Sequence, residues 1–473
     1  FLYGHIWTDP TLMPDQHRVV GLTLVGGPVG VWFLVVNRTP CGDDTTDVAD
    51  PDPDPPTSEP DSTEDEPDSV DESDLTAEPD DAPVELTASF RGATEDVIRV
   101  GVVAIDFDRL AAAGVQINSG DAGAIYTAAL EAINDRGGIY GRQLELTTET
   151  YLPIGGIEAD EICVRLAEDV EVFMVVGAIR LDQIFCYTEL NDITVIAVGQ
   201  QNQERNDRPN APYVTVRGRT DTRSAAWADA MVDAGVFEGE TVCVFGLVDA
   251  DEELYNETVA ALRAVGIEPV DGLVASNGGD VVANRAASEI IFEKLRSEGV
   301  TVTVHVSPVA DGLEIAGSIG YETKWVQNPA IGSGSLMAGG VDLSYVDGML
   351  TLTPTPVGTV DQPAMADDPA VAECVATIED RTDETVDYAL DAEIGNVNLA
   401  INACGAATIL ELALTAAGPD LTNDSLASAL AGLGEFSMAG FPSASLGPDD
   451  HAAADAGQLA RFSATEEASE FAE

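Results

Sequence analysis

Residues 131–146 read EAINDRGGIYGRQLEL and contain a sharp change from helix to strand. Upstream, apolar residues recur at three- and four-residue spacing from Ile125 to Ile133, which lays one apolar stripe along a helix. Downstream, apolar and polar residues alternate over 143–148, the period of a strand with one buried face. Gly137 follows the helix where a residue of positive φ is favoured, because glycine has no Cβ to clash. The stretch therefore predicts a helix-to-strand junction of an α/β fold.

The same alternation continues along most of the chain. Strands are expected at 97–105, 142–149, 171–177, 193–198, 241–246, 267–274 and 301–307, and helices at 119–136, 156–168, 182–190, 221–234, 251–265 and 282–297. A strand in MLTLTP near Gly348, long helices at 367–380 and 393–417, and strands at 436–441 and 458–462 complete the pattern. This order predicts two doubly wound, Rossmann-like α/β lobes joined by several crossings, with ligands bound at the carboxyl ends of the strands.

The charge of the chain limits its partners. Its 473 residues carry a formal charge of −63, and residues 43–85 hold no Lys or Arg. Such an acidic protein repels nucleic acid and anionic lipid surfaces, so neither is expected as a partner through a basic patch.

The first ninety-five residues are expected to be an export and tether region. Val19–Val36 is uncharged and long enough to cross a bilayer, so residues 1–40 read as a signal or membrane-anchor region; a buried helix of a soluble domain is the alternative. Cys41 is a candidate for lipid attachment, although the residues before it fit a lipobox poorly. Residues 41–95 are rich in Pro, Asp and Glu and are expected to form an acidic disordered linker.

Four segments together resemble the type I periplasmic binding proteins, in particular the Leu/Ile/Val-binding group. These are RVGVVAI (99–105), INDRGGIYGRQLEL (133–146), FMVVG (173–177) and ITVIAV (193–198). The resemblance covers about residues 96–465. It implies lobe 1 at 96–212 plus 336–433, lobe 2 at 213–335 plus 434–465, and a tail at 466–473. It also implies that the glycines of the second segment are structural and do not contact a ligand.

The function implied by this resemblance is solute capture outside the cytoplasm. A small solute, such as an amino acid or amide, would bind between the lobes and be delivered to an ABC permease, with the protein tethered to the membrane by its N-terminal anchor or a lipid. The alternative is the ligand-sensing ectodomain of a receptor, since the same fold serves signalling. An extracellular hydrolase is a remote alternative, because no phosphate loop, nucleophile elbow or dinucleotide motif is present. No catalysis and no cofactor is expected.

The cysteines fit an oxidising compartment. The resemblance implies a disulfide between Cys163 and Cys186, and Cys374 and Cys404 are candidates for a second one. Cys243 lies inside a strand and is expected to be a small buried residue. There is no C-x-x-C motif and the four His lie far apart, so no metal site is expected.

The topology places candidate ligand contacts after the strands. They are Asp106, Phe107, Ile179, Arg180, Gln200 and Gln201 from lobe 1, and Asp249, Ser307 and Ser333 from lobe 2. The segments after the third and fourth strands lack the hydroxyl residues that grip an amino acid's carboxylate in the family. Arg180 instead is expected to bind an anion, either a carboxylate of the ligand or an internal one such as Asp106 or Asp182.

Overall fold

The computed structural model describes residues 86–113, 119–153, 156–199, 201–247, 252–274, 281–307, 311–329, 344–390, 395–454 and 457–472, with three N-terminal strands. The chain falls into two compact units, Phe1–Asp80 and Asp81–Glu473. In the first, β1 (Tyr3–Thr8), β2 (Val19–Val25) and β3 (Trp32–Phe33) form an antiparallel sheet. Val19–Val25, at the start of the apolar run, forms a strand of 7 residues. Most of the rest of the anchor region, with Cys41 and the linker up to residue 85, lies outside the described residues.

The second unit begins before the predicted boundary at residue 96. Ala93 forms isolated β-bridges with Phe90 and with Ile98, and its side chain is 1% exposed. The backbone oxygen of Thr87 accepts a hydrogen bond from Arg142. The predicted linker is therefore too long at its end, because the apolar residues of this short segment pack on the first lobe.

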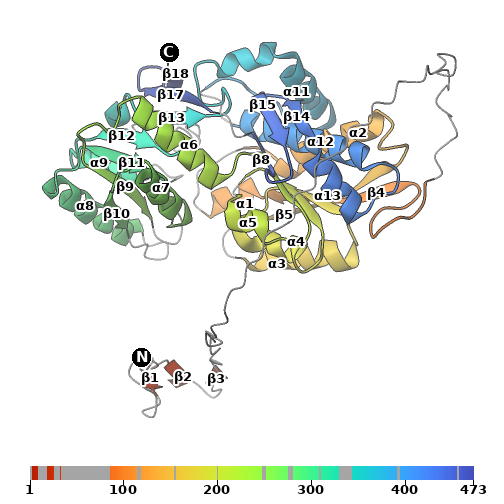
Figure 1. Ribbon diagram of the computed structural model, residues 1–473, viewed down its shortest axis with the longest axis horizontal. Coiled ribbons are helices and arrows are strands. Elements are labelled where there is room, and N and C mark those ends of the chain that lie inside the picture. Colours follow the sequence, from red (N-terminus) through yellow and green to blue (C-terminus); the bar gives the residue numbers. More distant parts are fainter. Residues whose placement is uncertain are drawn as a thin grey trace, which may run out of the picture. The chain divides into compact units, whose positions relative to one another are not determined.

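The first lobe is built on a six-stranded sheet in which all neighbouring strands are parallel (Figure 1). Its order is β5-β4-β6-β7-β8-β16, with β4 at Val97–Ile105, β5 at Gln143–Tyr151, β6 at Met174–Gly177, β7 at Thr194–Ala197, β8 at Tyr213–Arg217 and β16 at Ala452–Ala454. The inner strands are largely apolar because both faces of a parallel sheet are covered by helices.

Each face of this sheet has its own hydrophobic core. On one face, α2 (Ala122–Asp135) and α12 (Val397–Ala417) pack together. On the other lie α3 (Ile157–Val164), continued by a π-helix (Arg165–Asp169), and α4 (Ile184–Thr188). The remaining elements of this lobe are α1 (Phe107–Ala112), η3 (Leu181–Gln183), α5 (Gln203–Asp207), η5 (Gln362–Asp367), α11 (Pro369–Arg381), α13 (Asn423–Ala431), β14 (Gly434–Met438) and β15 (Phe441–Leu446). Within the described ranges α12 alone is long and apolar enough to cross a membrane. However, 67% of its apolar 18-residue stretch is buried inside the protein, as in a core helix.

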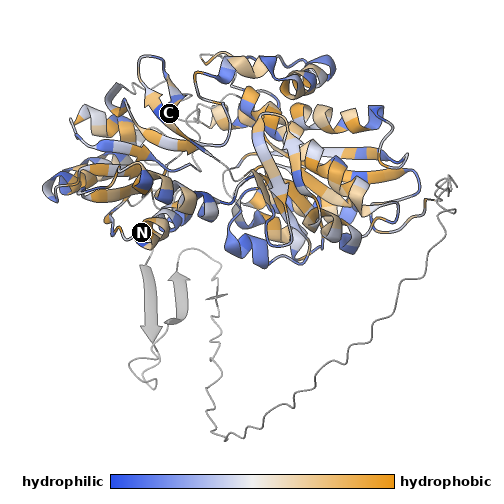
Figure 2. Ribbon diagram, turned by 45° about the horizontal axis from the view of Figure 1, so that its top comes forward, coloured by the Kyte–Doolittle hydropathy of each residue, from blue (hydrophilic) through white to orange (hydrophobic). Residues whose placement is uncertain are grey.

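The second lobe repeats the arrangement. Its sheet has the order β10-β9-β11-β12-β13-β17-β18, with β9 at Val242–Leu247, β10 at Val270–Val274, β11 at Val302–His305, β12 at Lys324–Gln327, β13 at Leu350–Thr353, β17 at Gln458–Ser463 and β18 at Ala468–Phe471. The helices α6 (Thr220–Asp233) and α7 (Glu252–Ala264) share one core, while α8 (Val281–Ser297), α9 (Asp311–Ser318) and the short η4 (Ser344–Val346) share the other. The strands of both lobes are largely hydrophobic in Figure 2. The predicted fold class, two doubly wound α/β lobes, is confirmed.

The sheets divide the chain at other points than the predicted boundaries. Assigned by sequence to the second lobe, β8 pairs with β7 of the first. Conversely, β13 pairs with β12 of the second lobe. Met438 of β14 and Phe441 of β15 join the first lobe's core, and β18 extends the second sheet into the expected tail. Alternation of strands and helices does not reveal which sheet a strand joins, because that depends on pairing between distant segments.

The glycine-rich junction after α2 has a structural role, as the sequence predicted. Asn134 links helix and strand, since its amide donates to the Leu144 oxygen at 3.0 Å and its oxygen accepts from the Leu144 nitrogen at 2.6 Å. Gly138 has φ +69°, and a Cβ there would lie 1.9 Å from the Arg142 oxygen. The Arg142 side chain is fully buried and donates to the backbone oxygens of Thr94, Pro419 and Thr87.

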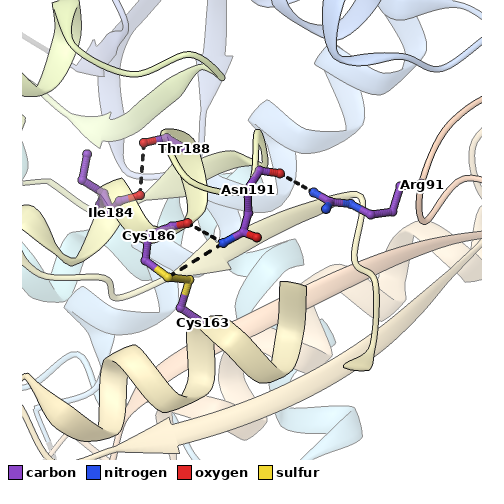
Figure 3. The surroundings of a disulfide bond; sticks show 6 residues. All are labelled: Arg91, Cys163, Ile184, Cys186, Thr188 and Asn191. Carbon is purple, nitrogen blue, oxygen red and sulfur yellow. Dashed lines mark hydrogen bonds between the residues drawn. A yellow bond between two sulfur atoms is a disulfide. The ribbon is translucent and has the colours of Figure 1, made fainter. Parts of the chain in front are cut away.

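Two disulfides join helices of the first lobe. Cys163 of α3 is bonded to Cys186 of α4, and the Asn191 amide donates to the Cys186 backbone oxygen at 2.8 Å (Figure 3). Cys374 of α11 is bonded to Cys404 of α12. Cys243 is buried, and burial raises the pKa of its thiol to about 12. The pairs are those expected from the sequence.

Candidate functional site

The order of strands creates one switch point in each sheet. In the first lobe β4 lies between β5 and β6, and in the second β9 lies between β10 and β11. Helices that follow adjacent strands at such a point leave toward opposite faces, so a crevice opens at the carboxyl ends of those strands. The candidate site is therefore the pair of edges where β4 and β6 end in one lobe and β9 and β11 end in the other.

Asp106 and Phe107 follow β4 at this edge. The Asp106 carboxylate accepts a hydrogen bond from the Arg109 nitrogen at 2.9 Å, and Phe107 is the first residue of α1. Asp106 is thus the N-cap of α1. Both residues are partly exposed at the predicted edge.

Ile179 and Arg180 follow β6 but differ in environment. Ile179 is 4% exposed and belongs to the first lobe's core, so its side chain packs internally. Arg180 is partly exposed and donates to the Pro153 oxygen at 3.2 Å. Among the described residues it has no carboxylate partner, since Asp182 pairs with Arg205 at 2.9 Å. The internal pairing with Asp106 or Asp182 that the sequence left open is not formed.

Gln201 is a buried structural residue and not an exposed contact. Its side chain is 0% exposed, and its amide donates to the Tyr213 oxygen at 2.7 Å. Its backbone oxygen accepts from the Thr220 nitrogen at 2.8 Å, where the chain enters the second lobe. This correction follows from the short connection between β7 and α5, which turns the side chain back onto β8.

Of the ligand contacts predicted for the second lobe, only Ser307 lies within the described residues. Ser307 is 2% exposed and lies two residues beyond the end of β11. Gln200, Asp249 and Ser333 lie outside the described residues. Nothing in the described ranges groups three or more metal-binding side chains.

A polar network that the sequence did not indicate joins the two lobes. Arg205 of α5 is 4% exposed and pairs with Asp182 and with Glu253 of α7. The Asn202 amide donates to Glu253 at 2.8 Å and to Glu257 at 3.3 Å. Asn202 is the N-cap of α5, and an Asn before a short polar run is the signal that predicts such a helix start.

Burial raises the pKa of Glu257 to about 7, and the negative charges of Glu253 and Asp221 act in the same direction. The folded protein therefore holds a proton that the unfolded chain, with a carboxyl pKa near 4.3, releases. We expect the free energy of unfolding to fall by up to about 1.4 kcal/mol per pH unit from this group as the pH rises toward 7. Urea unfolding of the wild type and Glu257→Gln at pH 5 to 8 measures this, because glutamine does not ionise. Parallel pH profiles of the two proteins would contradict it.

Arg217, at the end of β8, is held by neutral groups. Its Nε donates to the Asn402 oxygen at 3.1 Å, and Nη2 donates to the Asn398 oxygen, both from the start of α12. Burial lowers the pKa of Arg217 to about 10. No local sequence pattern indicates this contact, because the partners are about 180 residues apart.

The chain matches no protein-family model and no curated protein sequence. It is similar to the structure of a possible leucine/isoleucine/valine-binding protein from Rhodopirellula baltica SH 1, with 18% identity and a TM-score of 0.58 over 83% of this chain and 98% of that one. It is also similar to a fatty acid ABC transporter substrate-binding protein from Thermomonospora curvata, with 15% identity and a TM-score of 0.58 over 82% of this chain and 94% of that one. A third similar structure is a solute-binding protein of an ABC transporter from R. palustris in complex with 4-hydroxybenzoate. It has 12% identity and a TM-score of 0.58 over 80% of this chain and 96% of that one. The chain thus has the two-lobed fold seen in ABC transporter substrate-binding proteins.

Proposed function

We propose that the chain is an extracytoplasmic substrate-binding protein that captures a small organic carboxylate between its lobes and delivers it to an ABC permease. The two switch points support this, because ligands of open α/β sheets bind at such edges. The similar structures named above belong to proteins that bind solutes for transporters. The disulfides fit an oxidising compartment outside the cytoplasm.

Arg180 is the observation that carries the choice of a carboxylate. It follows a strand at the first lobe's switch point and has no carboxylate partner among the described residues. In a chain of charge −63, carboxylates are abundant, so an arginine left without one is available for an anionic ligand. Leucine, fatty acids and 4-hydroxybenzoate, named for similar structures, all carry a carboxylate.

The N-terminal region supplies the remaining part of the proposal. Val19–Val36 and Cys41 offer two ways to tether the protein at the membrane surface, near a permease. The acidic segment between them and the folded lobes would act as an extended spacer.

A thermal-shift screen tests the proposed function. The full chain is heated with each member of a library of small carboxylates and with the matching amide or methyl ester of each. A ligand that binds only the folded state at 100 times its Kd adds about 2.7 kcal/mol to stability. We expect at least one acid to raise the melting temperature while its uncharged analogue does not. A library in which no acid does so would contradict the proposal.

A further inference from the structure

Two polar side chains are buried at the ends of adjacent strands of the second lobe. His305 ends β11 and Gln327 ends β12, and the two are partners in the parallel register. Each is 0% exposed. Within the described part of the chain, neither nitrogen of the His305 ring and neither polar atom of the Gln327 amide has a hydrogen-bond partner.

The pair lies on the side of the sheet that α9 covers. The His305 ring stacks on Phe245, its register partner in β9, with ring centroids 6.1 Å apart. Gly312 of α9 packs closely there, since a Cβ on it would lie 2.4 Å from the Phe245 ring. Burial lowers the pKa of His305 to about 3, so the imidazole is neutral near pH 7. A neutral imidazole offers one donor and one acceptor.

Asn328, the residue after Gln327, is a buried amide that is paired within the fold. Asn328 is also 0% exposed, and its amide donates to Ser224 at 3.0 Å and to Thr258 at 2.8 Å. Those partners belong to α6 and α7, which cover the opposite face. Buried polar groups in folded proteins are nearly always paired, because leaving one unpaired is costly. Four unpaired polar atoms on two neighbouring strand ends are therefore unusual, and a polar group of a bound ligand is able to pair with them.

We propose that His305 and Gln327 form the second lobe's recognition pair for a neutral polar group of the bound carboxylate, such as a hydroxyl or a carboxamide. This inference rests on the proposed function. The pair ends two neighbouring strands at the carboxyl edge of the sheet, beside the switch point. A hydroxyl or carboxamide both donates and accepts, as do the imidazole and the amide, so it matches both residues. A second charged group would find no opposite charge in this pair.

Matched acids test the pair. Isothermal titration compares 4-hydroxybenzoate with benzoate, and glutamine with norleucine, on the full chain. We expect the wild type to bind the member with the extra polar group about 10- to 100-fold more tightly than its partner, because that group pairs with otherwise unpaired atoms. Gln327→Met and His305→Phe should each reduce this preference to near one. Asn328→Ala is the matched control, and it should lower the melting temperature while keeping the preference.

The outcomes separate the two proposals. If no acid of this panel or of the thermal-shift library binds, the proposed function fails and this inference falls with it. If acids bind but the wild type does not discriminate within a pair, or Gln327→Met still discriminates, the inference is overturned and the proposed function stands. The unliganded Gln327→Met variant should melt no lower than the wild type, because it removes unpaired polar atoms. A clear drop would show that the amide has structural partners and would overturn the inference as well.

Discussion

Replacing Arg180 by alanine is expected to weaken carboxylate binding by about 2–5 kcal/mol, the range for truncating one side of a buried charge pair. This corresponds to a Kd about 30-fold to several thousand-fold higher. The stability of the unliganded protein should change little, because the observed contact of Arg180 is one hydrogen bond to the Pro153 oxygen. Such a bond contributes only about 0.5–1.5 kcal/mol.

The measurement is a titration of wild type and variant with the acid that gives the largest thermal shift, together with their unliganded melting temperatures. Arg263→Ala is the matched control, since Arg263 is an exposed partner of Glu268 near the end of α7. It should leave affinity unchanged. A variant at Arg180 that loses stability but binds as well as the wild type would remove Arg180 from the site.

Removing the Cys163–Cys186 disulfide is expected to lower the free energy of unfolding by about 3 kcal/mol. The bond closes a loop with a sequence separation of 23 residues, and the chain-entropy estimate for such a loop gives about 3 kcal/mol. Denaturant unfolding of a Cys163→Ser/Cys186→Ser double variant measures the loss. The double variant avoids leaving one free thiol that could pair wrongly.

The control is the same pair of proteins under reducing conditions. Reduction also breaks the Cys374–Cys404 bond in both proteins, so the wild type should lose its advantage over the double variant. If the oxidised wild type and the double variant unfold at the same denaturant concentration, or mass mapping of exported protein finds both thiols free, the bond does not contribute as described.

The sequence predicted the elements well where the pattern is local. The apolar stripe of α2 and the positive φ of Gly137, at +103°, follow from residue spacing and from glycine's lack of a Cβ. The lobe to which each strand belongs was harder to predict. The strand β8 reads like any apolar strand, and only its pairing with β7 places it in the first lobe. Pairing between segments far apart in sequence leaves no local pattern.

The candidate site shows the same limit. Topology predicted that Arg180 and Asp106 follow strands at the carboxyl edge of the first sheet, and both do, because strand order fixes where the carboxyl ends of parallel strands lie. It did not separate Arg180 from its buried neighbour Ile179, since side-chain direction after a strand depends on the turn. The His305 and Gln327 pair was missed because each is a single polar residue at the end of an apolar strand. Their juxtaposition appears only when β11 and β12 are paired.

Capture of a ligand between the lobes is the central claim. It predicts that the lobes close on the ligand, and a spin-label distance measures that closure directly. Labels are attached to cysteines at Ile157 in the first lobe and Ile290 in the second, which are 76% and 71% exposed, in a Cys41→Ser background. A control pair at Ile157 and Leu190, the latter 77% exposed, lies within one lobe. Saturation with an acid that raises the melting temperature should shift and narrow the inter-lobe distance distribution while the control stays unchanged. Superimposable inter-lobe distributions with and without that bound acid would contradict capture between the lobes.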